Sequence, residues 1–189
     1  MPQLRYPGGL RKALTLSYDD GVEQDIRLME ILDKYGLKCT FNLNSGCYAP
    51  EGKVYPAGTI HRRMPESRVL ELYKNPNHEV AVHCLTHASL VELPTPQMVA
   101  EVMKDRENLE KAFGGIITGM AYPFGAYNDE VVEVLRMCGF RCWGNILALN
   151  EIGPFVSVEA VNAKRDAYSL AWFRPGDEIE YRVKVYNPG

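Results

Sequence analysis

Residues 12–21, with the sequence KALTLSYDDG, read as a strand that runs into a turn. The apolar and β-prone residues predict a strand over 12–18, and Asp19-Asp20-Gly21 predicts the turn that ends it. Parallel α/β proteins place their active sites at the carboxyl ends of strands, which is where these two carboxylates stand. An ordinary Asp-Gly turn and a magnesium-binding acid pair that accepts a phosphoryl group are the alternatives for this segment.

Strand-helix units continue along the chain after this segment. Leu28, Ile31, Leu32 and Tyr35 recur at helical spacing, and Gly36 follows at a C-cap position. Further strands are expected at 37–43, 79–82, 116–121 and 140–143, with helices from Pro65 to before Pro76, from an N-cap at Thr95 to 113, and from an N-cap at Asn128 to Gly139. Four such units in a row predict an α/β fold with a parallel sheet or barrel.

Two segments differ from this alternation of strands and helices. Residues 44–64 contain three glycines and two prolines and predict a long loop, a functional insertion or a lid. After about Asn150, residues 155–161 and 177–186 alternate as antiparallel strands do. We therefore expect a catalytic domain over 1–150 and a divergent β-rich tail over 151–189, which either completes the barrel or begins a second domain.

Composition excludes several classes of partner. The 189 residues are 46% hydrophobic and 24% charged, with a net charge of -3, as is typical of a folded globular chain. No basic run extends beyond Arg62-Arg63, so we expect no nucleic-acid partner. No stretch is apolar enough for a membrane span, and five cysteines without a CxxC pair favour a reduced, cytoplasmic location, unless a signal peptide has been removed.

A histidine pair and a proline turn add chemistry at the same sheet edge. His83 and His87 are spaced i, i+4, which would place both imidazoles on one side of a helical turn at the end of the strand 79–82. An aspartate and two histidines there could hold one metal ion and leave a position open for water. A non-haem iron site and a merely structural histidine pair are the alternatives, and His61 and His78 are expected to face solvent. The turn at 122–125 can present a backbone N–H to a ligand.

Three segments together resemble the polysaccharide deacetylases of the NodB-homology type, carbohydrate esterase family 4. They are residues 17–21 (SYDDG), 83–87 (HCLTH) and 121–125 (AYPFG), which are similar, in this order, to the family's TFDDG, HxxxH and RPPYG motifs. The resemblance covers about residues 12–143. It implies a distorted or incomplete (β/α) barrel, here with an atypical β-rich C-terminal tail.

The resemblance also implies roles for individual residues. Asp19 would be the general base, and Asp20, His83 and His87 would bind one divalent ion, zinc foremost, with cobalt, nickel or manganese as other candidates. The backbone N–H of Phe124 would join the metal in holding the oxyanion. The implied activity is a hydrolase that acts on non-peptide carbon–nitrogen or ester bonds and removes acetyl groups from oligo- or polysaccharides by means of a metal-bound water.

The sequence departs from the family in two places. Ala121 and Tyr122 stand where the third motif has the arginine that orients the catalytic aspartate, and no histidine follows His87 to serve as the late general acid. Loss of one proton-transfer partner lowers a rate by about a hundredfold to ten-thousandfold, with less effect on an O-acetyl ester. Either the chain diverges before the acid, or another residue replaces it, or the protein is a carbohydrate-binding pseudoenzyme on the same fold.

Overall fold

The computed structural model describes residues 14–140 and, beyond them, the backbone of strands at 142–144, 155–160, 164–165, 171–172 and 181–186. The chain divides into two compact units, Met1–Asn145 and Ile146–Gly189. No helix of the described residues combines the length and the apolar composition that a bilayer crossing requires.

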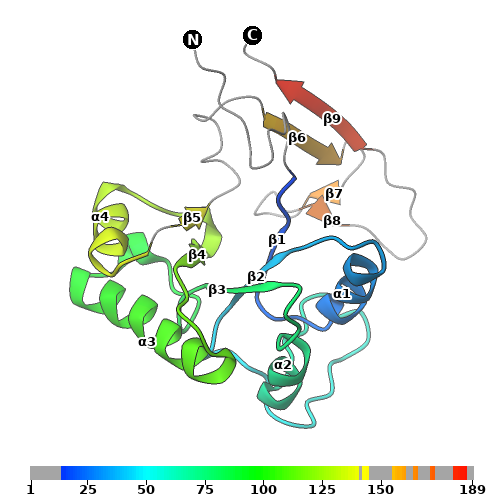
Figure 1. Cartoon of the computed structure of the whole chain (residues 1–189), viewed down its shortest axis with the longest axis horizontal. Helices are drawn as coiled ribbons and strands as arrows, with labels where there is room; N and C mark the ends of the chain where they lie inside the picture. The colour runs from blue at the N-terminus through cyan, green and yellow to red at the C-terminus, as the bar shows by residue number, and fades with distance from the viewer. Residues whose placement is uncertain are drawn as a thin grey trace. The chain divides into compact units, whose positions relative to one another are not determined.

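A five-stranded parallel sheet forms the centre of the first unit (Figure 1). Its strands are β1 (Ser17–Asp19), β2 (Thr40–Leu43), β3 (Glu79–Val82), β4 (Gly119–Ala121) and β5 (Cys142–Gly144). Their spatial order is their sequence order, so that each connection leads to the neighbouring strand. This winding is that of a (β/α) barrel which has not closed, and it confirms the expected fold class.

Most of the strands are shorter than the sequence predicted. The hydrogen-bonded ladder begins only at Ser17, Thr40 and Gly119, although the apolar runs begin earlier. β1 extends one residue further than expected and includes Asp19. Apolar residues thus continue past the paired backbone into the connections, which hydrophobic patterning alone cannot separate from strands.

Within residues 14–140, four helices connect the strands. They are α1 (Gln24–Lys34), α2 (Glu66–Leu72), α3 (Thr95–Phe113) and α4 (Asp129–Met137), and short 3-10 turns lie at η2 (Leu90–Glu92) and η3 (Pro123–Gly125). α3 packs against β3 and α4 (Figure 1). The predicted cap of α4 is confirmed, because the Asn128 side chain accepts the Val131 N–H at 2.9 Å.

Two helix predictions were wrong in detail. Thr95 is the first residue of α3 rather than its N-cap, which is Pro94, and its hydroxyl donates to Glu130 Oε1 (2.7 Å). The buried side of α1 contains Met29 and Leu32, whereas Ile31 is partly exposed and Tyr35 lies 65% exposed at the C-cap. Of the four predicted apolar positions, Leu32 is buried and Leu28 packs against the core, whereas Ile31 and Tyr35 do not, and Met29 takes their place.

The core of this unit lies on one side of the sheet. Phe41 and Leu43 of β2 are fully buried, and Phe41 packs against the Tyr73 ring with centroids 5.1 Å apart. Since successive side chains of a strand point to opposite faces, Asn42 points to the other face. That face carries the polar groups of the site described below.

Strands of the second unit pair antiparallel. β6 (Phe155–Ala160) pairs with β9 (Tyr181–Tyr186), and β7 (Lys164–Arg165) pairs with β8 (Ala171–Trp172). The alternation at 155–160 and 181–186 therefore does correspond to an antiparallel pair, and residues 161 and 177–180 lie outside the described residues.

Candidate functional site

Three predicted ligands come together at the carboxyl edge of the sheet. Asp20 follows β1 directly, and His83 follows β3. One ligand atom each of Asp20, His83 and His87 lies within 4.8 Å of the others. Asp19 is the last residue of β1, and its Oδ2 lies 3.9 Å from His83 Nε2, so the fourth predicted polar residue borders the same cluster.

Left-handed backbone conformations bring these side chains together. The φ angles are 81° at Asp20, 66° at Cys84, 58° at His87 and 58° at Phe124. Residues with a Cβ seldom adopt such values, and they cluster at functional sites when they do. The two histidines therefore do not share a helical turn, as their spacing suggested, but an irregular turn that places their rings 4.8 Å apart.

Both imidazoles are set up to act as metal ligands. His83 Nδ1 lies 2.9 Å from the Ala121 carbonyl oxygen. Because a carbonyl can only accept, Nδ1 carries a proton, and in the neutral ring Nε2 then has the lone pair that a metal needs. Burial lowers the pKa of His87, which favours the neutral ring that binds metals. His87 Nε2 lies 3.6 Å from Asp20 Oδ1.

Asp20 is held as an anion by its neighbours. Burial alone would raise its pKa, but the Arg63 guanidinium at 2.6 Å from Oδ1, His61 and the two cluster histidines together hold the pKa below its usual value. His61 Nε2 lies 3.0 Å from the second oxygen, Oδ2. A carboxylate that stays ionised is the form that a cation requires.

Arg63 ties the long loop 44–64 to the site. Besides the Asp20 carboxylate, its Nη1 donates to the Asp20 carbonyl (3.0 Å) and to Asn44 Oδ1 (2.9 Å). Asn44 in turn donates to the carbonyls of His83 and Cys84. In the sequence Arg63 stands out only as part of the basic pair Arg62-Arg63, so no motif predicts its contacts with Asp20 and Asn44.

Asp105 of α3 is a further residue that sequence reasoning missed. It is fully buried, and its carboxylate accepts the backbone N–H of Ser45 (2.7 Å) and of His83 (3.1 Å). Ser45 and His83 lie just past the carboxyl ends of β2 and β3. Asp105 therefore links the two strand ends and fixes the backbone of one predicted ligand.

The other histidines lie differently from expectation. His61 is 56% exposed, as predicted, but it contacts Asp20. The prediction that His78 faces solvent was wrong, because its side chain is only 2% exposed. Its ring packs edge-on against Phe41 (5.5 Å), and its Nε2 lies 3.2 Å from Asp33 Oδ1.

Phe124 reaches the site from β4. It lies in the 3-10 turn that follows this strand, and its ring meets the His87 ring edge-on with centroids 4.5 Å apart. The Phe124 side chain is 73% exposed. Its ring therefore covers one side of His87 while remaining open to a bound molecule.

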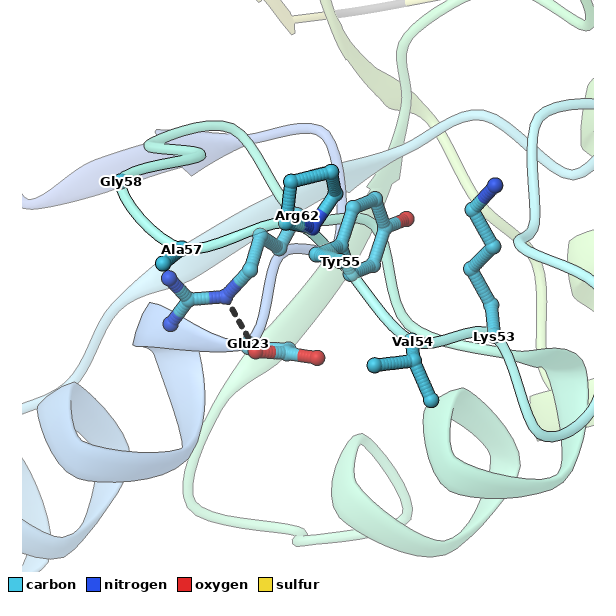
Figure 2. Close-up of a pocket in the computed structure, with 8 residues that line it drawn as sticks. Glu23, Lys53, Val54, Tyr55, Ala57, Gly58 and Arg62 are labelled. Carbon is cyan, nitrogen blue, oxygen red and sulfur yellow. Dashed lines mark hydrogen bonds and ion pairs between the residues drawn. The ribbon is translucent and has the colours of Figure 1, made fainter.

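A pocket of about 360 Å³ lies along the loop 44–64 (Figure 2). The Arg62 guanidinium and the Glu23 carboxylate form an ion pair at its wall, and the Tyr55 hydroxyl donates to the Arg63 carbonyl at 2.9 Å. The lining residues are Glu23, Arg62 and the segment 53–58. None of the three clustered ligands is among them, so this pocket does not contain the site.

Comparisons with known proteins place this geometry in a family. A sequence profile described as polysaccharide deacetylase matches residues 7–143. No curated protein matches the sequence.

Solved structures share the fold at low sequence identity. A Streptococcus pyogenes deacetylase in complex with acetate is 21% identical over 69% of this chain and 54% of its own, with a TM-score of 0.55. A Streptomyces lividans family 4 carbohydrate esterase in complex with acetate is 21% identical over 70% of this chain and 62% of its own, also at 0.55. A family 4 pseudoenzyme from Bacillus anthracis is 22% identical over 70% of this chain and 43% of its own, at 0.54.

The chain thus spans between 43% and 62% of the length of these three structures. The family profile, in contrast, covers well over half of the chain and includes all three motifs. The chain belongs to the polysaccharide deacetylase family.

Proposed function

We propose that this protein is a metal-dependent hydrolase that removes acetyl groups from N- or O-acetylated saccharides. The observation that carries the proposal is the cluster of Asp20, His83 and His87, with Asp19 at its border. Family membership supports deacetylation in general. Two solved structures of the same fold are described with acetate bound, which is the product of such a reaction.

The donor set fits one divalent ion. Two imidazoles and one carboxylate suit zinc, and also cobalt, nickel or manganese. His83 would bind through Nε2, since Nδ1 donates to Ala121, and Asp20 would bind as the anion that Arg63 maintains. When bound, such an ion supplies a water of lowered pKa and stabilises negative charge on the substrate carbonyl.

Asp19 is the proposed general base. Its side chain is about half exposed, so that a substrate can approach it, and one of its oxygens faces the ligand cluster. It accepts the proton of the water that attacks the acetyl carbonyl. The Phe124 N–H is the proposed donor to the developing oxyanion, because Phe124 directly follows the β4 end and its ring contacts His87.

Acetate release from the full-length chain tests the proposal. The substrates are N-acetylglucosamine oligomers and an O-acetylated xylan, with zinc, cobalt, nickel or manganese added in turn. We expect release that is lost on chelation and in Asp20→Ala but kept in Asp129→Ala, which removes a carboxylate from the first turn of α4. Release that survives chelation and Asp20→Ala would overturn the hydrolase. Saccharide binding without turnover under every metal would favour the pseudoenzyme instead.

Metal content tests the cluster independently of turnover. About one equivalent of metal by elemental mass spectrometry is expected in the wild type and much less in His83→Ala. His78→Ala is the matched control, since His78 and His83 flank opposite ends of β3. Equal metal in both variants would remove His83 from the ligand set.

A further inference from the structure

We propose that Asn42 is the positioning residue that orients the Asp19 carboxylate for proton transfer. The inference rests on the proposed function, in which Asp19 is the base. It concerns a residue outside all three motifs, in the middle of a strand that carries no other group of the predicted site.

The sheet register places Asn42 beside Asp19. β1 and β2 run parallel, and Asp19 pairs with Asn42 across them. Neighbouring residues of paired strands point to the same face of a sheet. On its other side, Asn42 pairs with Ala81 of β3, whose side chain is small. The amide therefore lies next to the carboxylate because of the topology.

The Asn42 amide donates to one oxygen of Asp19. Its Nδ2 lies 2.7 Å from Asp19 Oδ1, 2.8 Å from Ser17 Oγ and 3.3 Å from the Tyr18 carbonyl oxygen. These three acceptors all belong to β1. The donor group is thus fixed from several sides and cannot turn away from Asp19 without losing further bonds.

Asn42 is buried, and an asparagine is unfavourable at a buried position unless its amide makes hydrogen bonds. Asn42 is 2% exposed and stands between the fully buried Phe41 and Leu43. Burying an amide is unfavourable unless its hydrogen bonds are made, whereas an apolar side chain would carry no such penalty. The bond to Asp19 compensates for part of that penalty and constrains the direction of the carboxylate.

The hydrogen bond distinguishes the two oxygens of Asp19. Oδ1 is held by Asn42, and Oδ2 is the oxygen 3.9 Å from His83 Nε2, on the side of the ligand cluster. A carboxylate that rotated freely would present this oxygen only part of the time. Asn42 thus keeps one oxygen available to take a proton at the cluster, and it does so without adding a positive charge.

Asp20 is held by different means. Its Oδ1 pairs with the Arg63 guanidinium, and its Oδ2 lies 3.0 Å from His61. The adjacent aspartates therefore have distinct supports, a cation for the proposed metal ligand and a neutral amide for the proposed base. Replacing Asn42 should consequently affect turnover and leave metal content unchanged.

The test compares Asn42→Ala with Asn108→Ala in the full-length chain. Asn108 is the matched control because its Nδ2 makes a similar bond, to Ser45 Oγ at 3.0 Å, away from Asp19. We expect kcat for acetate release to fall about ten- to a hundredfold in Asn42→Ala, as for loss of a hydrogen bond to a charged group. KM and metal content should stay within about twofold, and Asn108→Ala should keep all three values.

Crystal structures of the wild type and of Asn42→Ala give a readout that does not depend on turnover. The expected result is a single Asp19 conformer in the wild type and a rotated or multiple conformer in the variant. Asn42→Leu, close in size and without a donor, takes the place of the alanine variant if that one fails to fold. An unchanged kcat, or an unchanged Asp19 conformer, overturns the positioning role.

The two readouts separate this inference from the proposed function. If the wild type releases no acetate from any substrate, the hydrolase proposal fails, and the Asp19 conformer alone decides whether Asn42 orients it. If the wild type is active and Asn42→Ala is equally active, the hydrolase stands and the role of Asn42 is refuted.

Discussion

Replacing Asp105 by alanine is expected to lower the free energy of unfolding and to weaken metal binding at once. The carboxylate accepts the backbone N–H groups of Ser45 and His83, and it is fully buried. Its removal leaves the partly buried Ser45 N–H without this acceptor, whereas the His83 N–H keeps its bond to the Leu43 carbonyl oxygen (2.9 Å). The change therefore acts on the two strand ends that carry the site.

The magnitude follows mainly from the bond to Ser45. A buried donor left without an acceptor costs about 1–3 kcal/mol, and the His83 N–H adds less because it keeps a second acceptor. Alanine also removes a carboxyl group whose burial disfavours its charged form, which offsets part of the loss. We therefore expect Asp105→Ala to be about 1–3 kcal/mol less stable at neutral pH. Asp105→Asn keeps one acceptor and should lose about half as much.

The loss should depend on pH in a defined direction. Burial raises the pKa of Asp105 to about 6, from 3.8 in the unfolded chain. The folded state thus favours the protonated acid, and this contribution to stability is present at low pH and lost as the pH rises through 6. The difference between wild type and Asp105→Ala should accordingly be larger at pH 5 than at pH 7.5.

Urea unfolding followed by far-UV circular dichroism at the two pH values measures the effect, with metal content determined on the same samples. Glu107→Ala is the control, because Glu107 lies on the same helix but pairs only at the surface with Lys104. It should change stability by less than about 0.5 kcal/mol. The reasoning is refuted if Asp105→Ala matches that control, or if its destabilisation is smaller at pH 5 than at pH 7.5.

Three further predictions concern single contacts. Asn128→Ala should lower stability by about 0.5–2 kcal/mol in urea unfolding, because the α4 cap is lost, while Asn128→Ser keeps it. Burial raises the pKa of Asp25 to about 6, although the Tyr73 hydroxyl donates to its carboxylate. The free energy of unfolding should therefore fall as the pH rises from about 4 to 6.5, and Asp25→Asn should make this fall shallower; a slope equal to that of the wild type would contradict this. Arg63→Met removes two hydrogen bonds that tie loop 44–64 to Asp20 and one that joins the two ends of the loop at Asn44, so limited proteolysis within this loop should become at least several-fold faster than in the wild type; an unchanged cleavage rate would show that the loop is held by other contacts.

Local signals made much of the fold predictable. The cap at Asn128 and the strand 79–82 are confirmed because turn and cap chemistry acts over a few residues. On α1, Leu28 and Leu32 face the core as predicted, but Ile31 does not, since Ile31 and Met29 have similar apolar character and only packing decides between them. The starts of β1, β2 and β4 were also wrong, because a partner strand sets them.

Some residues of the candidate site could likewise be predicted from the sequence, and others could not. Asp20, His83 and His87 could be expected together because each follows a parallel strand, and parallel strands end at one edge. Arg63, Asn42 and Asp105 could not be identified in this way. Each acts on a residue at least 22 positions away in the chain, and for Asp105 the group recognised is a backbone N–H, which has no sequence signature.

Buried polarity is concentrated around this site. The buried polar or charged residues of the described chain are Asp25, Asn42, Asn44, His83 and Asp105. All except Asp25 bond at the carboxyl ends of β1, β2 and β3. A sheet needs no such residues in order to pack, and each of them is unfavourable unless its partners are in place. Asn44 and Asp105 bond to the backbone of the same residue, His83, and so stiffen it, as a site requires if it is to hold a cation in a fixed position. Loss of one of them should therefore weaken the other, so that the double variant Asn44→Ala with Asp105→Ala is expected to deviate from additivity in the free energy of unfolding.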